Sequence, residues 1–223
     1  MAGMRRSRVG AMGLTATLVV GLLVGCVAHA DESEKRERQI GEAAAEREEF
    51  VSELVLFNVK QIALGELALE RSQDPQVQKF AKQLVTDHRK NLGDLRAWAD
   101  KEALEIAAVD LSGSPGEQGV GGSGSAGVQE GYEERMVDVD DDLDEDIGDA
   151  QRDLREVREK QGKEFDQAFL SRVIDDQREG QELVGDGLDD YRADSDFGLL
   201  LNRTGNLIYR NEERGRSVKE ALD

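Results

Sequence analysis

The chain has 223 residues, a length that allows one domain with extensions. Its net charge of -19 repels nucleic-acid phosphates and therefore argues against a nucleic-acid-binding protein. Only 4% of the residues are aromatic and there are two prolines. Residues that favour helices (Ala, Leu, Glu, Gln and Arg) are abundant, and they predict an all-α fold.

Residues 1–25 have the pattern of a signal peptide. Three arginines precede an apolar stretch that is too short and too rich in glycine for a permanent membrane span. The stretch ends in Leu-Val-Gly-Cys, which resembles the lipobox of bacterial lipoproteins, and Cys26 is the only cysteine in the chain. We therefore expect lipidation at Cys26 and attachment to a membrane through this N-terminal anchor. The expected location is the periplasmic side of the cell envelope, as an outer-membrane lipoprotein.

An ordinary signal peptide is the alternative. Cleavage after Ala28-His29-Ala30 would release a soluble periplasmic or secreted protein that begins at Asp31.

The next two segments predict the first half of a helical bundle. Residues 26–49 are charged and rich in alanine, which fits either a tether or the start of a long helix. Apolar residues at three- and four-residue spacings then predict two helices within 50–105. Asp74 can cap the second helix, and Pro75 fits its first position. Because the connection between them is short, we expect the two helices to pack antiparallel.

The middle of the chain looks like an insertion. Residues 106–130 form a Gly/Ser-rich linker that we expect to be flexible. Residues 131–160 are strongly acidic, yet apolar residues recur at heptad-like intervals, which predicts an acidic amphipathic helix of the coiled-coil kind. The run 138–146 does not fit a calcium-binding EF-hand, because Leu143 stands where that loop needs glycine. This segment is the expected contact surface for cations or for another envelope protein.

Residues 161–223 complete the predicted bundle with a third helix over about 163–191 and a fourth from near Ser195. One polar residue interrupts the apolar stripe of each bundle helix, and these are Gln61, His88, Gln177 and Asn211. Removing a polar group from water is costly unless it finds a partner, so we expect these four side chains to meet and hydrogen-bond. The acid pairs at 175–176 and 189–190 fall beside the stripe and are predicted to lie on the surface.

Several stretches resemble the bacterial ferritin-like family called domain of unknown function 4142. They are FNVKQIALGELAL at 57–69, DPQVQKFA at 74–81, TDH at 86–88 and FDQAF at 165–169, and the resemblance covers about 50–104 and 163–220. It implies an antiparallel ferritin-like four-helix bundle, with the linker and the acidic helix inserted between its second and third helices. It also implies glutamate at position 61 and histidines at positions 88, 177 and near 211, of which only His88 is present.

Amides are much poorer metal ligands than carboxylate and imidazole, and His88 has no glutamate three residues before it. The sequence therefore predicts a non-enzymatic envelope lipoprotein that has no cofactor and no catalytic residue. Its buried polar cluster is interpreted as structural, and His88 is the one remaining candidate metal ligand. The alternatives are a ferritin-like metal-binding redox or storage protein and a protein that buffers divalent cations through its acidic segment.

Overall fold

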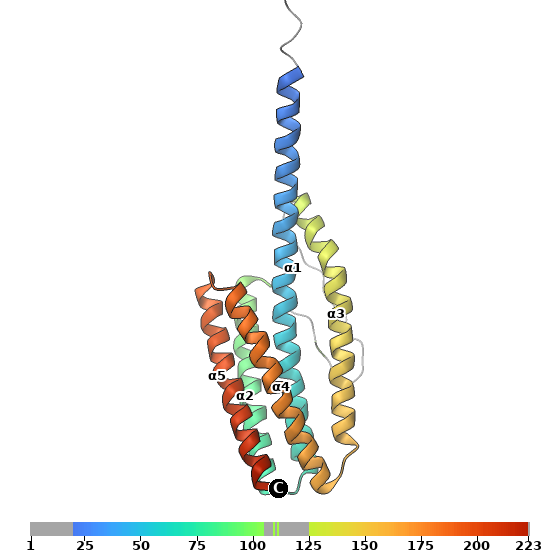
Figure 1. The fold of residues 1–223 in the computed structure, drawn as a ribbon, viewed down its shortest axis with the longest axis vertical. Helices are drawn as coiled ribbons and strands as arrows, with labels where there is room; N and C mark the ends of the chain where they lie inside the picture. The colour runs from blue at the N-terminus through green and yellow to red at the C-terminus, as the bar shows by residue number, and fades with distance from the viewer. Residues whose placement is uncertain (1–19, 105–108, 110, 112–124, 223) are drawn as a thin grey trace, which may run out of the picture.

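The computed structural model describes residues 20–104, 109, 111 and 125–222, with side chains from residue 32 onward. Within these residues the fold is all-α and contains no strand, which confirms the predicted class. Figure 1 shows five helices, which are α1 (Val20–Arg71), α2 (Pro75–Glu102), α3 (Ala126–Arg158), α4 (Gly162–Asp190) and α5 (Ser195–Leu222). The predicted signal peptide lies mostly outside the described residues, as does most of the predicted Gly/Ser linker.

Helix α1 is continuous over 52 residues, and its length is about 78 Å at 1.5 Å per residue. The segment 26–49, for which the sequence left a tether or a helix open, is therefore helical. In Figure 1 the N-terminal part of α1 extends past α2, α4 and α5, and the beginning of α3 lies beside it. None of the described helices combines the length and the hydrophobicity needed to cross a membrane.

The connections from α1 to α2 and from α4 to α5 are short, and a capping residue stands at the end of each. The Asp74 side chain accepts hydrogen bonds from the backbone N–H groups of Gln76 and Val77 at 2.7 and 3.1 Å, and Pro75 occupies the first turn of α2. Asp194 accepts a hydrogen bond from the backbone N–H of Phe197 at 2.9 Å, before the first turn of α5. These starts follow closely on the ends of α1 and α4, so each pair of helices packs antiparallel.

Helices α1, α2, α4 and α5 enclose a core in two apolar clusters. The first contains residues from 51–55 of α1, on the side of the core toward the N-terminus of that helix, and includes Leu54, Trp98 and Phe197. The second lies toward the other end and includes Leu84 and Phe169, together with residues from the end of α3. Along each of the four helices, polar residues occupy the stretch between the parts that enter the two clusters. The core is thus divided by a polar layer.

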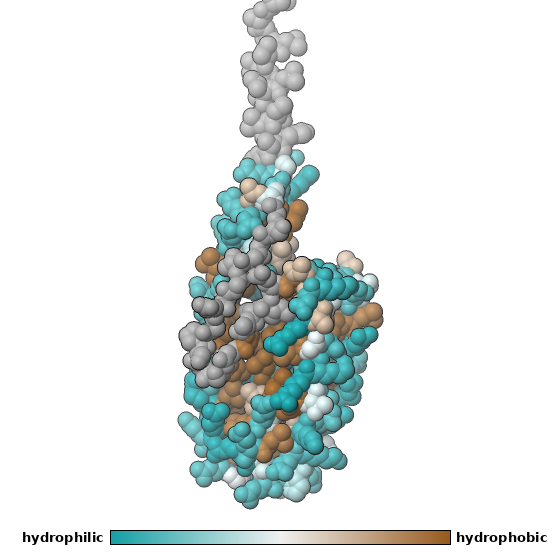
Figure 2. Space-filling view, turned by 180° about the vertical axis from the view of Figure 1, so that it is seen from behind, coloured by the Kyte–Doolittle hydropathy of each residue, from teal (hydrophilic) through white to brown (hydrophobic). Residues whose placement is uncertain are grey.

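Helix α3 packs mainly along α1 on the outside of the other helices. Two glycines permit a close crossing near its start, because a Cβ atom at Gly41 would overlap with the backbone of Val128 and one at Gly131 with the backbone of Arg38. The helix begins at Ala126, so the last residues of the predicted linker are helical. Figure 2, seen from behind, shows apolar side chains in a strip along the helices, bordered by hydrophilic surface.

Candidate functional site

The candidate site is the polar layer between the two apolar clusters. Gln61 of α1, His88 of α2, Gln177 of α4 and Asn211 of α5 each have 0% of their surface exposed. Gln177 Nε2 lies 2.8 Å from Gln61 Oε1 and 3.2 Å from His88 Nε2. Asn211 Nδ2 lies 3.5 Å from His88 Nε2. The structure therefore brings together all four polar residues that the helical periodicity places on the inner face.

The direction of each hydrogen bond in this layer follows from one carboxylate, Asp176. An ionised carboxylate only accepts, so Gln61 Nε2 donates to Asp176 Oδ2 at 2.7 Å and Gln61 Oε1 is left to accept from Gln177 Nε2. The second hydrogen of that Gln177 amide then points to His88 Nε2, which must accept it. The proton of the imidazole is therefore on Nδ1, which donates to Asn58 Oδ1 at 3.0 Å.

His88 is held neutral by its surroundings. Burial lowers the pKa of His88 to about 3, because the charged imidazolium would lose its hydration. The ring of Phe57 packs edge-on against it with 5.4 Å between ring centroids. Both ring nitrogens already have hydrogen-bond partners. The imidazole is therefore suited to joining helices and poorly placed to titrate near neutral pH.

The sequence interpretation of Asp176 as a surface residue is wrong, since only 1% of its surface is exposed. Lys60 Nζ lies 2.9 Å from Asp176 Oδ1 and 2.6 Å from Asp153 Oδ2, and Arg172 Nη1 lies 3.3 and 2.7 Å from the same two atoms. Burial raises the pKa of Asp176 above its ordinary value, and the charge of Lys60 opposes this rise. These two acids and two bases connect α1, α3 and α4.

A signal for Asp176 was present in the sequence. It lies three residues after Val173 and seven after Phe169, a spacing that places it on the inner face of α4. Asn58 was also missed. It is fully buried, and its Nδ2 donates to the carbonyl oxygen of Leu54 at 2.7 Å, so it continues the polar layer along α1.

A groove of about 430 Å³ opens beside this charged group, between α1, α3 and α4. Acidic side chains from all three helices line it, among them Glu53, Asp146 and Glu179, and Phe57 and Leu183 add an apolar part. Burial, together with the nearby charges of Glu49, Asp146 and Asp142, raises the pKa of Glu53 to about 7. Lys60 and Asp176 also line the groove, and Asp176 accepts a hydrogen bond from Gln61, so the groove lies at one end of the polar layer.

The donor set of the polar layer offers little to a metal ion. Three of its four predicted members are neutral amides, and the one imidazole uses both nitrogens in hydrogen bonds. Among the described residues, no group of three or more His, Cys, Asp and Glu side chains is arranged to hold a metal ion. Gln177 Oε1 is buried without a hydrogen-bond partner, which is an acceptor position that a single buried water could occupy.

The other predicted positions lie elsewhere. Cys26 falls within the first turns of α1, and its side chain is outside the described part of the chain. The acidic run 138–146 lies within α3. A continuous helix cannot form the looped ligand arrangement of an EF-hand.

Comparison with known proteins finds a family match for one segment of the chain. Residues 32–119 match the family described as Domain of unknown function (DUF4142). The predicted resemblance to this family is thereby confirmed, and the DUF4142 match includes most of α1 and all of α2. It ends before α3, so the resemblance of 163–220 stays a prediction. Neither a curated protein nor a solved structure matches the chain.

Proposed function

We propose that this protein is a lipid-anchored envelope protein whose helices α1, α2, α4 and α5 form a ferritin-like four-helix bundle used for interaction and not for metal chemistry. The polar layer carries the proposal. In a ferritin-like bundle the metal ligands project into the interior from facing helices. Here the corresponding interior positions hold amides that hydrogen-bond to one another and to His88.

A structural role explains the polar layer without a ligand. Its hydrogen bonds run from Asp176 through Gln61 and Gln177 to His88 and Asn58, and so connect α4, α1 and α2. Sliding one helix by a turn would separate these partners and leave several polar groups buried and unpaired. The layer therefore fixes the register of the helices.

The outer side of α3 is the proposed interaction surface. This helix contains thirteen acids and four arginines, a net charge of -9, and most of the acids between 133 and 149 are exposed. Such a surface favours a basic partner through electrostatic steering, and the attraction weakens as salt is added. We propose a basic segment of another envelope protein as the partner, with the lipid at Cys26 holding the chain at the outer membrane.

Two measurements test this proposal. The chain produced in bacteria that are fed an alkyne-labelled fatty acid should take up the label, and the Cys26→Ser variant should not. Metal analysis of the purified protein should find less than a tenth of an equivalent of iron, manganese or zinc, whereas a stoichiometric metal that is lost in His88→Ala would refute the structural role. Equal labelling of both proteins would refute the lipid anchor.

A further inference from the structure

The charge of this protein is unevenly distributed among its helices. α2 carries six bases and four acids and α5 carries five bases and four acids, so the pair has a net charge of +3. α4 carries three bases and nine acids, and α3 has a net charge of -9. The pair α2 and α5 is therefore basic in a chain whose net charge is -19.

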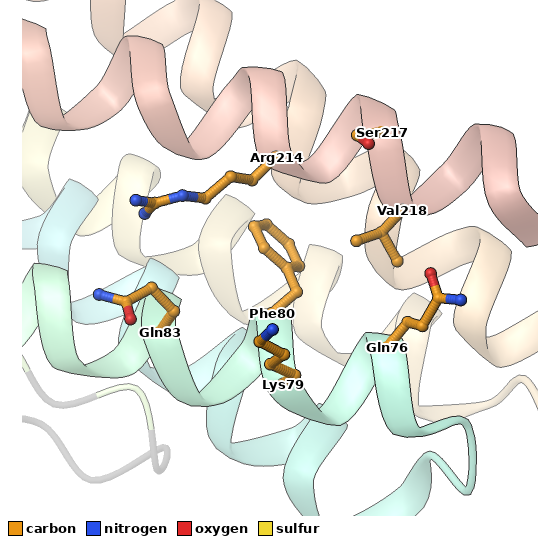
Figure 3. Close-up of a pocket in the computed structure, with 7 residues that line it drawn as sticks. All are labelled: Gln76, Lys79, Phe80, Gln83, Arg214, Ser217 and Val218. Carbon is orange, nitrogen blue, oxygen red and sulfur yellow. The ribbon is translucent and has the colours of Figure 1, made fainter.

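A groove of about 530 Å³ lies between α2 and α5. Figure 3 shows Phe80 of α2 between the two helices, with Arg214 and Val218 of α5 on the opposite wall and Lys79 beside it. Phe80 is 4% exposed and forms the apolar floor of the groove. Gly215 allows α5 to approach this ring, because a Cβ atom there would lie 3.3 Å from the ring of Phe80.

Both cations of the groove can accept a further anionic partner. Lys79 is exposed and has neither an ion pair nor a hydrogen bond to any described residue. The Arg214 side chain is 45% exposed, and its Nη1 is 3.2 Å from Asp87 Oδ2 and 3.4 Å from Asn211 Oδ1. The remaining guanidinium donors are available for bidentate binding of a carboxylate.

We propose that this groove binds a short acidic peptide segment of a partner protein in an extended conformation. In an extended chain successive side chains point to opposite sides, so an acidic residue can reach the basic rim while its apolar neighbour contacts Phe80 and Val218. The uncharged polar side chains of the groove, from Gln76, Gln83 and Ser217, supply donors and acceptors for peptide groups.

A peptide fits these observations better than a continuous anionic surface does. A chain with a net charge of -19 repels an extended anionic surface such as a membrane of anionic lipids or a nucleic acid. A segment with two or three carboxylates contacts the groove alone. The proposed site is separate from the acidic surface of α3, so it predicts a second partner or a second contact with the same partner.

The test uses the purified full chain and a fluorescent, blocked peptide Glu-Leu-Glu-Leu-Glu, with Gln-Leu-Gln-Leu-Gln as the matched peptide. Binding measured by fluorescence anisotropy should be at least ten times weaker for the glutamine peptide. It should also be at least ten times weaker for the Lys79→Gln/Arg214→Gln variant, and several times weaker when sodium chloride is raised from 25 to 300 mM.

The matched control replaces Arg96 and Arg203 with glutamine, because both lie on the same two helices and outside the groove. This control should bind within a factor of two of the parent. Lys79→Gln alone changes an exposed, unpaired residue and serves if the double variant unfolds in circular dichroism melting. Equal binding of the two peptides, an equal loss in the control, or binding only to phosphatidylglycerol vesicles would overturn the proposal.

Discussion

Replacing Glu53 with glutamine should stabilise the protein at alkaline pH and have little effect at acid pH. Glu53 lies on α1 and faces α3, close to the carboxylates of Glu49, Asp142 and Asp146. Its pKa of about 7 in the folded protein exceeds its ordinary value of 4.5. The folded state therefore holds a proton that the unfolded state has lost, and the cost of ionising Glu53 grows as the pH rises from 4.5 to 7.

The size of the effect follows from this difference in pKa. A shift from 4.5 to about 7 corresponds to roughly 3 kcal/mol at 1.36 kcal/mol per pH unit. Glu53 keeps contact with solvent at the groove, so screening reduces the expected gain to about 1–2 kcal/mol. Glutamine has nearly the same shape and no charge. The variant should thus be more stable than the parent by this amount at pH 8.5 and by almost nothing at pH 4.5.

Urea unfolding followed by circular dichroism at pH 4.5, 6, 7 and 8.5 measures this difference directly. The control is Glu70→Gln, which removes an exposed carboxylate near the end of the same helix. Its stability relative to the parent should not change with pH over this range. A difference for Glu53→Gln that is constant with pH, or that grows toward acid pH, would refute the reasoning.

Three further predictions concern the polar layer. His88→Leu should lower the free energy of unfolding by about 2–3 kcal/mol, because it leaves buried amides unpaired. It should also remove the loss of stability that the parent shows in urea unfolding as the pH falls from 6.5 toward 3. The same loss of stability at acid pH in the variant and the parent would contradict this. Asp176→Asn should lower the free energy of unfolding by about 1–3 kcal/mol, because Lys60 and Arg172 lose one of their two acidic partners and keep only Asp153. A thermal unfolding midpoint equal to that of the parent would count against it. The combination Gln61→Glu, Gln177→His and Asn211→His should bind about one divalent metal ion per chain in elemental analysis, because these side chains already meet in the interior; a folded variant without metal would show that their geometry is unsuitable.

Much of the helical arrangement could be predicted because it depends on local sequence. The start of α2 follows from Asp74 and Pro75, whose capping and fixed backbone angle need no distant partner. The polar layer was predictable for a related reason, since helical periodicity places Gln61 and Gln177 on inner faces whatever they contact. What the sequence could not provide was their order of contact, which depends on how the helices are rotated against each other.

The missed features depend on neighbours that are distant in sequence. Asp176 looked like half of a surface acid pair. It can be buried because Lys60 of α1 and Arg172 of α4 neutralise its charge. The packing of α3 along α1 could not be predicted from the sequence either. It depends on Gly41 meeting the backbone at Val128, and residues 87 positions apart give no joint pattern in one sequence.

The unbroken course of α1 has a consequence for where the protein can act. Residues 26 and 61 belong to the same helix, and they are separated by about 53 Å along its axis at 1.5 Å per residue. A flexible tether would allow the domain a range of distances from its attachment point. If Cys26 carries the proposed lipid, a helix of this length keeps Gln61 at a constant distance from the attachment point, so the domain can tilt about that point and cannot approach it.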